Sequence, residues 1–164
     1  MKITYYLSIQ QLKQIYYNLI YPYISYSILA WGSVYNSHIK KIQVKQNHTV
    51  RLIFFARTFG KETESAKPLL NLLHLLAVDN IYRLEILKFS HSWHNSRLPE
   101  VFDNTFQYAR NVHRYNTRYT AKQNFYKYKV KTNVGKQSVS YMAIDIWKDL
   151  PSSLKDLSVY FQSI

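Results

Sequence analysis

Two pairs of acidic residues are spaced closely enough to be considered as ligands for two-metal nucleotidyl transfer. They are Glu62 with Glu64, in an expected loop, and Asp145 with Asp149, one turn apart on an expected helix. Two-metal catalysis needs carboxylates that converge on ions about 3.5–4 Å apart. Acidic pairs at these spacings are ordinarily surface charge, and Lys148 beside the second pair favours that interpretation. We therefore expect no catalytic residues and no polymerase active site.

The residues that usually hold metals, cofactors or phosphate groups are also too few. His91 and His94 would share one face of a helix, but the chain has no cysteine that could complete a ligand set. Gly32, Gly60 and Gly135 stand far apart, so neither phosphate-binding glycine motif can be formed. We expect no metal and no cofactor.

Basic and aromatic residues alternate between residues 106 and 131, where the chain has no acidic residue. Arginine binds phosphate through paired N–H donors, and neighbouring rings offer stacking surfaces to unpaired bases. The residues predicted to contact nucleic acid in this segment are Arg110, Arg114, Tyr115, Arg118, Tyr119, Lys127, Lys129 and Lys131. The alternative is that the tyrosines pack against helices while the cations only face water.

The charge of the whole chain supports the same class of partner. Among 164 residues, 22 Lys and Arg stand against 9 Asp and Glu, and the chain has 16 tyrosines. Residues 1–61 and 104–144 each carry 8 basic residues and no acidic one, whereas 62–103 carry 4 basic and 6 acidic residues. A solvated face normally mixes both signs, so two acid-free blocks favour binding to phosphates.

Apolar residues at helical spacing predict helices over most of the chain. The predicted helices cover residues 8–20, 23–31, 38–56, 69–76, 79–95 and 138–150. Pro22 is expected in the first turn of the second helix or at a kink. Asp79 is expected to cap the helix that follows it.

The segments between these helices predict other structures. Periodicity fails over 104–122, which predicts an extended loop, and 125–131 alternate as in a strand. A turn is expected at 133–135. The fold class is therefore expected to be mainly α: a small helical bundle, an extended basic loop, a short β segment and a C-terminal helix. We expect one region over 1–100 and a second over 101–164.

The sequence predicts neither a secretory signal nor a membrane span. The start lacks a continuous apolar region, and 14–39, although free of Lys, Arg, Asp and Glu, is interrupted by Asn, Ser and Pro. We expect an intracellular protein, in the nucleus or the cytoplasm, that is not secreted.

Several short sequence motifs occur along the chain in an order that resembles one known family. They are Tyr16-Tyr17, Tyr21-Pro22-Tyr23, Trp31-Gly32, Gln46-Asn47, Leu98-Pro99, Tyr115-Asn116-Thr117-Arg118, Asn133-Val134-Gly135-Lys136 and Leu150-Pro151. Over nearly its whole length the chain resembles the C-terminal region of a non-LTR retrotransposon reverse transcriptase of the jockey-like group. That region comprises the thumb and the extension after the polymerase core.

The resemblance implies a non-catalytic part of an RNA-directed DNA polymerase. The paired aspartates of the palm have no counterpart here, so polymerase activity is not implied. Residues 1–100 would be thumb-like, with Lys40, Lys41, Lys45 and Arg51 toward a primer–template backbone. The implied partners are RNA and DNA, with an RNA–DNA hybrid expected, and a separate polypeptide that carries the palm and fingers.

Two alternatives remain open at this point. The chain could be an inactive structural remnant of a decayed element, which would show poor solubility or a molten state when made alone. It could also be a basic protein of membrane surfaces, which would bind liposomes but not nucleic acid.

Overall fold

The structure, a computed structural model, describes residues 7–33, 36–55, 66–113, 115 and 117–155, and they form two compact units. The division falls after Tyr82, inside helix α6 (Val78–His94). The sequence placed the division near residue 100. It falls earlier because Phe89 and Trp93 of α6 pack against Phe102 and Phe106, so the second half of α6 belongs to the C-terminal unit.

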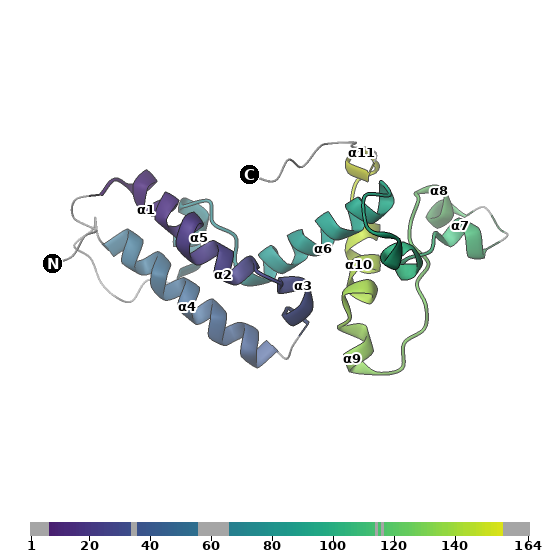
Figure 1. Cartoon of the computed structure of the whole chain (residues 1–164), viewed down its shortest axis with the longest axis horizontal. Helices are drawn as coiled ribbons and strands as arrows, with labels where there is room; N and C mark the ends of the chain where they lie inside the picture. The colour runs from purple at the N-terminus through teal and green to yellow at the C-terminus, as the bar shows by residue number, and fades with distance from the viewer. Residues whose placement is uncertain (1–6, 34–35, 56–65, 114, 116, 156–164) are drawn as a thin grey trace. The chain divides into compact units, whose positions relative to one another are not determined.

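The N-terminal unit is a set of helices around one apolar core (Figure 1). Its helices before α6 are α1 (Ile9–Ile15), a π-helix (Tyr16–Ile20), α2 (Tyr21–Ser25), α3 (Ile28–Trp31), α4 (Asn36–Phe55) and α5 (Ala66–Leu72). Both α1 and α5 pack against α4. The core residues are Leu12, Tyr16, Val50, Leu69, Leu70, Leu73 and Leu75.

The predicted helix over 23–31 is broken in two. Pro22 lies in the first turn of α2, as expected, and the chain before it widens into the π-helix. Ser27 adopts the left-handed conformation, with φ of 49°, which ends α2 and frees the carbonyl of Tyr26. The indole N–H of Trp31 donates to that carbonyl at 2.8 Å, which satisfies it. The break therefore depends on a contact that apolar spacing does not reveal.

Polar side chains of α4 fix the start of α6. Gln46 is buried and donates to the hydroxyl of Tyr16 and the carbonyl of Leu76, each at 2.7 Å. Gln43 accepts from the backbone N–H of Val78 at 2.9 Å. The helix therefore begins one residue before Asp79, which lies in its first turn and was predicted as its cap.

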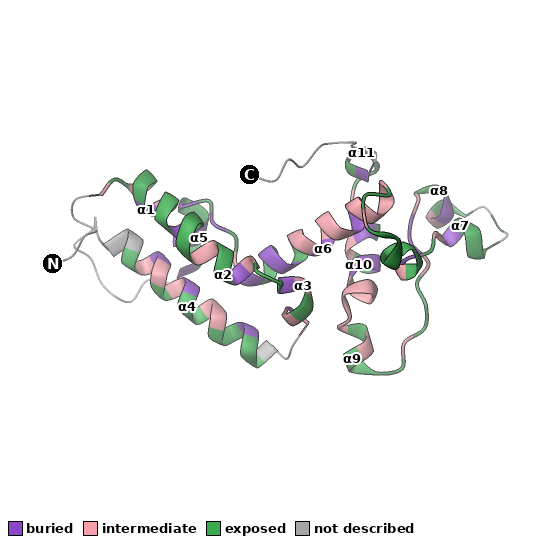
Figure 2. Cartoon of the chain, in the orientation of Figure 1, coloured by how far each residue is buried: buried purple, intermediate pink, exposed green. Residues whose placement is uncertain are grey.

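The C-terminal unit is built around stacked rings. Phe125 lies between Phe106, at 4.6 Å and an interplanar angle of 14°, and Trp147, at 4.9 Å and 15°. Phe125 and Trp147 have no exposed surface. Around them lie the 3-10 helix η3 (Glu100–Thr105), α7 (Ala109–Val112), α8 (Arg118–Ala121), α9 (Asn133–Lys136), α10 (Val139–Lys148) and α11 (Ser152–Lys155). Buried residues lie on α6, α7, α8 and α10 of this unit (Figure 2).

The mainly α fold class is confirmed, but three local predictions for this unit are wrong. The expected loop over 104–122 contains α7 and α8, and the expected turn at 133–135 forms α9. No strand is present in the described residues: the alternating segment 125–131 forms one antiparallel bridge, between Tyr108 and Phe125. The ladder stops there because 127–131 would have to pair with 102–106, most of which lie in the 3-10 helix η3, so 127–131 have no backbone partner among the described residues.

Candidate nucleic-acid interface

Helix α4 presents lysines on the side opposite its core contacts. Ile39 and Val50 are buried, whereas Lys40, Lys41 and Lys45 are exposed. Lys41 and Lys45 are four residues apart and therefore lie on one face. None of the three lysines forms an ion pair within the described residues.

Arg51, the fourth predicted contact on α4, is placed differently. Its side chain is half-buried, and its Nε is buried with no hydrogen-bond partner in the described part of the chain. Only part of the Arg51 guanidinium group can therefore contact a ligand that approaches from solvent.

In the C-terminal unit, α7 and α8 position the arginines of the predicted site. Arg110 is exposed, and its guanidinium carbon lies 5.1 Å from the centre of the Tyr108 ring. Arg118 is exposed in the first turn of α8, which Thr117 caps by accepting from the N–H of Thr120 at 3.3 Å. Arg114 lies outside the described residues.

The two tyrosines proposed as stacking platforms differ in exposure. Tyr115 is 81% exposed, so its ring is accessible. Tyr119 is half-buried and its hydroxyl donates to the carbonyl of Phe125 at 2.8 Å, which anchors α8 to the ring stack. Burial raises the pKa of Tyr119. Its ring therefore contributes mainly to the fold of this unit.

The lysines of the extended segment 127–131 also fall into two groups. Lys127 forms an ion pair with Asp145 of α10 and lies 4.9 Å from the centre of the Tyr141 ring. The hydrogen bond to Asp145 raises the pKa of Lys127. Lys129 and Lys131 are exposed and have no ion-pair partner among the described residues. They are therefore available to phosphate, whereas Lys127 must first leave its carboxylate.

Beside this segment lies a cavity of about 320 Å³. Its lining residues are Asn104, Thr105, Phe106, Gln107, Tyr126, Tyr128 and Ile144. The side-chain amides can both donate and accept hydrogen bonds, as base edges do, and tyrosine rings can stack on bases. The sequence analysis missed Asn104 and Gln107, because neutral amides in an irregular segment carry no periodicity or charge signal.

The acidic and histidine pairs form no metal site in the described residues. Asp145 is paired with Lys127, and Asp149 ends α10 as an exposed residue. The side chain of His91 contacts Asn95, while Nδ1 of His94 is 2.7 Å from the hydroxyl of Tyr108. Glu62 and Glu64 lie outside the described residues.

Among the helices in the described ranges, none combines the length and the apolar composition needed to span a membrane. Comparison of the chain with protein-family models, curated proteins and solved structures gave no match. The functional argument therefore rests on the geometry of the two units.

Proposed function

We propose that this chain binds nucleic acid without catalysing a reaction, as the thumb and post-polymerase extension of a non-LTR retrotransposon reverse transcriptase. The sequence motifs given above support the retroelement assignment. In such an enzyme the catalytic carboxylates belong to the palm, so the partner that supplies activity would be a separate polypeptide carrying palm and fingers. Nucleic-acid binding is the part of this proposal that the chain's own geometry supports.

The observation that carries the proposal is a set of six exposed cations between residues 110 and 136 that have no carboxylate partner among the described residues. They are Arg110, Arg118, Lys122, Lys129, Lys131 and Lys136. Each unpaired cation that contacts a phosphate displaces a counterion, and this release drives association. A face that served only solubility would mix in carboxylates, but the one carboxylate that pairs within this surface is Asp145.

The cavity beside Lys127 supports a role for unpaired bases. The rings of Tyr126 and Tyr128 and the amides of Asn104 and Gln107 would not be needed for binding to phosphates alone. A base that leaves a strand could stack on a ring there while its edge meets an amide. We therefore expect a hybrid with an unpaired overhang to bind more tightly than a blunt hybrid of the same length.

The direct test removes two of the unpaired lysines. The variant Lys129→Ala/Lys131→Ala is titrated against a labelled RNA–DNA hybrid over a series of salt concentrations. The slope of log K against log[salt] is expected to become shallower by about two units, since each phosphate contact contributes about 0.9. The matched control, Arg83→Ala/Lys88→Ala, removes the same net charge from the near-neutral middle of the chain.

The outcomes separate the proposal from its main alternative. An unchanged slope in the lysine variant would show that Lys129 and Lys131 do not contact phosphate, and equal changes in variant and control would show that the cations act only through net charge. If the unmodified chain binds the hybrid weakly and with a shallow slope, it is an inactive remnant of the element.

A further inference from the structure

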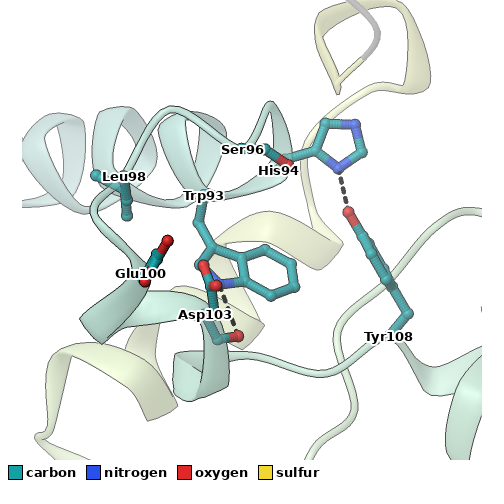
Figure 3. A pocket seen from close by; sticks show the side chains of 7 residues that line it. All are labelled: Trp93, His94, Ser96, Leu98, Glu100, Asp103 and Tyr108. Carbon is teal, nitrogen blue, oxygen red and sulfur yellow. Dashed lines mark hydrogen bonds between the residues drawn. The ribbon is translucent and has the colours of Figure 1, made fainter.

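A second cavity of the C-terminal unit, of about 420 Å³, is lined by residues of α6, of η3 and of the segments beside them (Figure 3). Its volume is within the range of small-ligand pockets, about 300–1,000 Å³. Trp93, Leu98 and Tyr108 provide apolar and aromatic walls, and Glu100 and Asp103 provide carboxylates. The function proposed above uses none of these residues.

Two carboxylates enter this cavity from the same side of one helix. Glu100 and Asp103 are three residues apart on η3, and residues at this spacing eclipse each other on a 3-10 helix. Both lie in the lining of the cavity. Both residues are exposed, and neither side-chain carboxylate forms an ion pair or a hydrogen bond within the described residues.

Contacts with α6 hold η3, the helix that carries the two carboxylates, in place. The indole N–H of Trp93 donates to the carbonyls of Phe102, at 3.0 Å, and Asp103, at 3.3 Å. The ring of Phe102 packs edge-on against Phe89 at 5.5 Å. These contacts hold η3 to α6, so the two carboxylates need little reordering when a ligand arrives.

The opposite wall is equally constrained. Nδ1 of His94 lies 2.7 Å from the hydroxyl of Tyr108, a hydrogen bond that Figure 3 shows at the edge of the cavity. The indole of Trp93 lies 5.4 Å from the Tyr108 ring. The rings therefore remain in place as apolar walls beside the carboxylates.

The charge of the cavity is opposite to that of the chain. The net charge is +13, yet no lysine or arginine lines this cavity. Paired carboxylates beside aromatic rings attract cations through ion pairing and through the negative ring faces. The apolar side chain of Leu98 is suited to contact the aliphatic chain, or stem, that carries such a cation.

We propose that this cavity binds an organic cation, an ammonium or guanidinium group on an apolar stem. The group would lie between Glu100 and Asp103, and its stem would contact Trp93, Tyr108 and Leu98. Such a group occurs in free amines and in the lysine and arginine side chains of proteins. The proposal does not depend on nucleic-acid binding, which uses different residues of this unit.

The test is a calorimetric titration of the whole chain with butylguanidinium, with pentanamide as its neutral counterpart. Saturable binding of butylguanidinium and none of pentanamide is expected, together with a shift of the Trp93 indole N–H resonance. Because the chain as a whole repels cations, saturable binding requires a local site. Failure of butylguanidinium to bind, or equal binding of both compounds, would overturn the proposal.

The assignment to these carboxylates is tested by Glu100→Gln/Asp103→Asn. Affinity is expected to fall about fivefold for each carboxylate removed. The matched control, Asp79→Asn/Asp149→Asn, makes the same charge change at exposed acids outside the cavity. Circular dichroism confirms that both variants fold. Equal loss in variant and control, or unchanged affinity in the variant, would contradict the site.

A blocked peptide with a single central arginine then distinguishes the two sources of the cation. Binding of the peptide that is lost in Glu100→Gln/Asp103→Asn supports a protein side chain as the occupant. Binding of butylguanidinium without the peptide supports a free amine, because the cavity then has no room for the flanking backbone.

Discussion

Replacing Gln46 with methionine tests whether its buried hydrogen bonds hold the N-terminal unit together. Gln46 is 1% exposed, and its amide group donates to Tyr16 and Leu76 and accepts from Gln43 at 2.8 Å. Methionine has a similar volume, so the substitution removes the polar contacts with little change in packing. The hydroxyl of Tyr16, itself 1% exposed, loses this partner inside the core.

The expected magnitude follows from these three bonds. An unsatisfied buried hydroxyl costs about 1–3 kcal/mol, and the other two groups, which can reach water, lose about 0.5–1 kcal/mol each. Gln46→Met should therefore lower the free energy of unfolding by about 2–5 kcal/mol. Urea unfolding followed by far-UV circular dichroism measures this change. The control Gln14→Met, at an exposed position of α1, should lie within about 0.5 kcal/mol of the original chain.

A double-mutant cycle with Tyr16→Phe decides whether the bond itself is responsible. Each single change leaves one buried partner unsatisfied, whereas Gln46→Met/Tyr16→Phe removes both partners. The double variant should therefore lose at least about 1 kcal/mol less than the sum of the two singles. If the two losses add to within about 0.3 kcal/mol, the hydrogen bond does not stabilise the unit as described.

Three further predictions concern single residues. Gly32→Ala should lower the free energy of unfolding by about 1–3 kcal/mol, because an added Cβ would collide with the ring of Tyr82; urea unfolding measures this. Burial raises the pKa of Tyr82. The unfolded chain therefore loses the Tyr82 hydroxyl proton at a lower pH than the folded chain does, so the free energy of unfolding should fall as pH rises above about 10. The variant Tyr82→Phe should lose less of its free energy of unfolding over that pH range than the original chain does. Equal losses in the variant and the original chain, measured by urea unfolding at each pH, would contradict this. Asp145→Asn frees Lys127 and should steepen the salt slope of hybrid binding by about one unit; Asp149→Asn, with the same charge change but no paired lysine, should not.

The sequence predicted those parts of the fold that depend on local signals. The helix over 138–150 was identified because Ile144 and Trp147 repeat at helical spacing and Pro151 ends it; both apolar residues are buried, and the structure adds that Ser138 caps the helix. The helix over 38–56 corresponds to α4, because Ile39 and Val50 belong to its apolar stripe and both are buried. Caps and apolar spacing act within a few residues, so a single sequence carries them.

Elements fixed by distant contacts could not be predicted. The segment 125–131 alternates like a strand, but whether it forms one depends on a partner at 102–106, most of which instead forms η3. The short helix α8 is capped by Thr117 and Thr120, whereas the expected capping pattern has Glu or Gln at the second position. The break at Ser27 depends on the indole of Trp31.

For the candidate site, too, local signals could be predicted from the sequence and distant contacts could not. Residue type identified the cations, since arginine and lysine in an acid-free block are visible in the sequence alone. Which cations are neutralised and which rings are buried depends on contacts between separate segments, such as Lys127 with Asp145 or Tyr119 with the carbonyl of Phe125. The cavity lined by Glu100 and Asp103 could not be predicted either, because its walls come from α6, η3 and the segment before α7.

The central claim, that the chain binds nucleic acid through its unpaired cations, is tested most directly by fluorescence anisotropy. The whole chain is titrated against a labelled RNA–DNA hybrid over a series of salt concentrations. If the six unpaired cations between residues 110 and 136 each contact a phosphate, the slope of log K against log[salt] should be about −5. A slope near zero, with weak binding at every salt concentration, would contradict the claim.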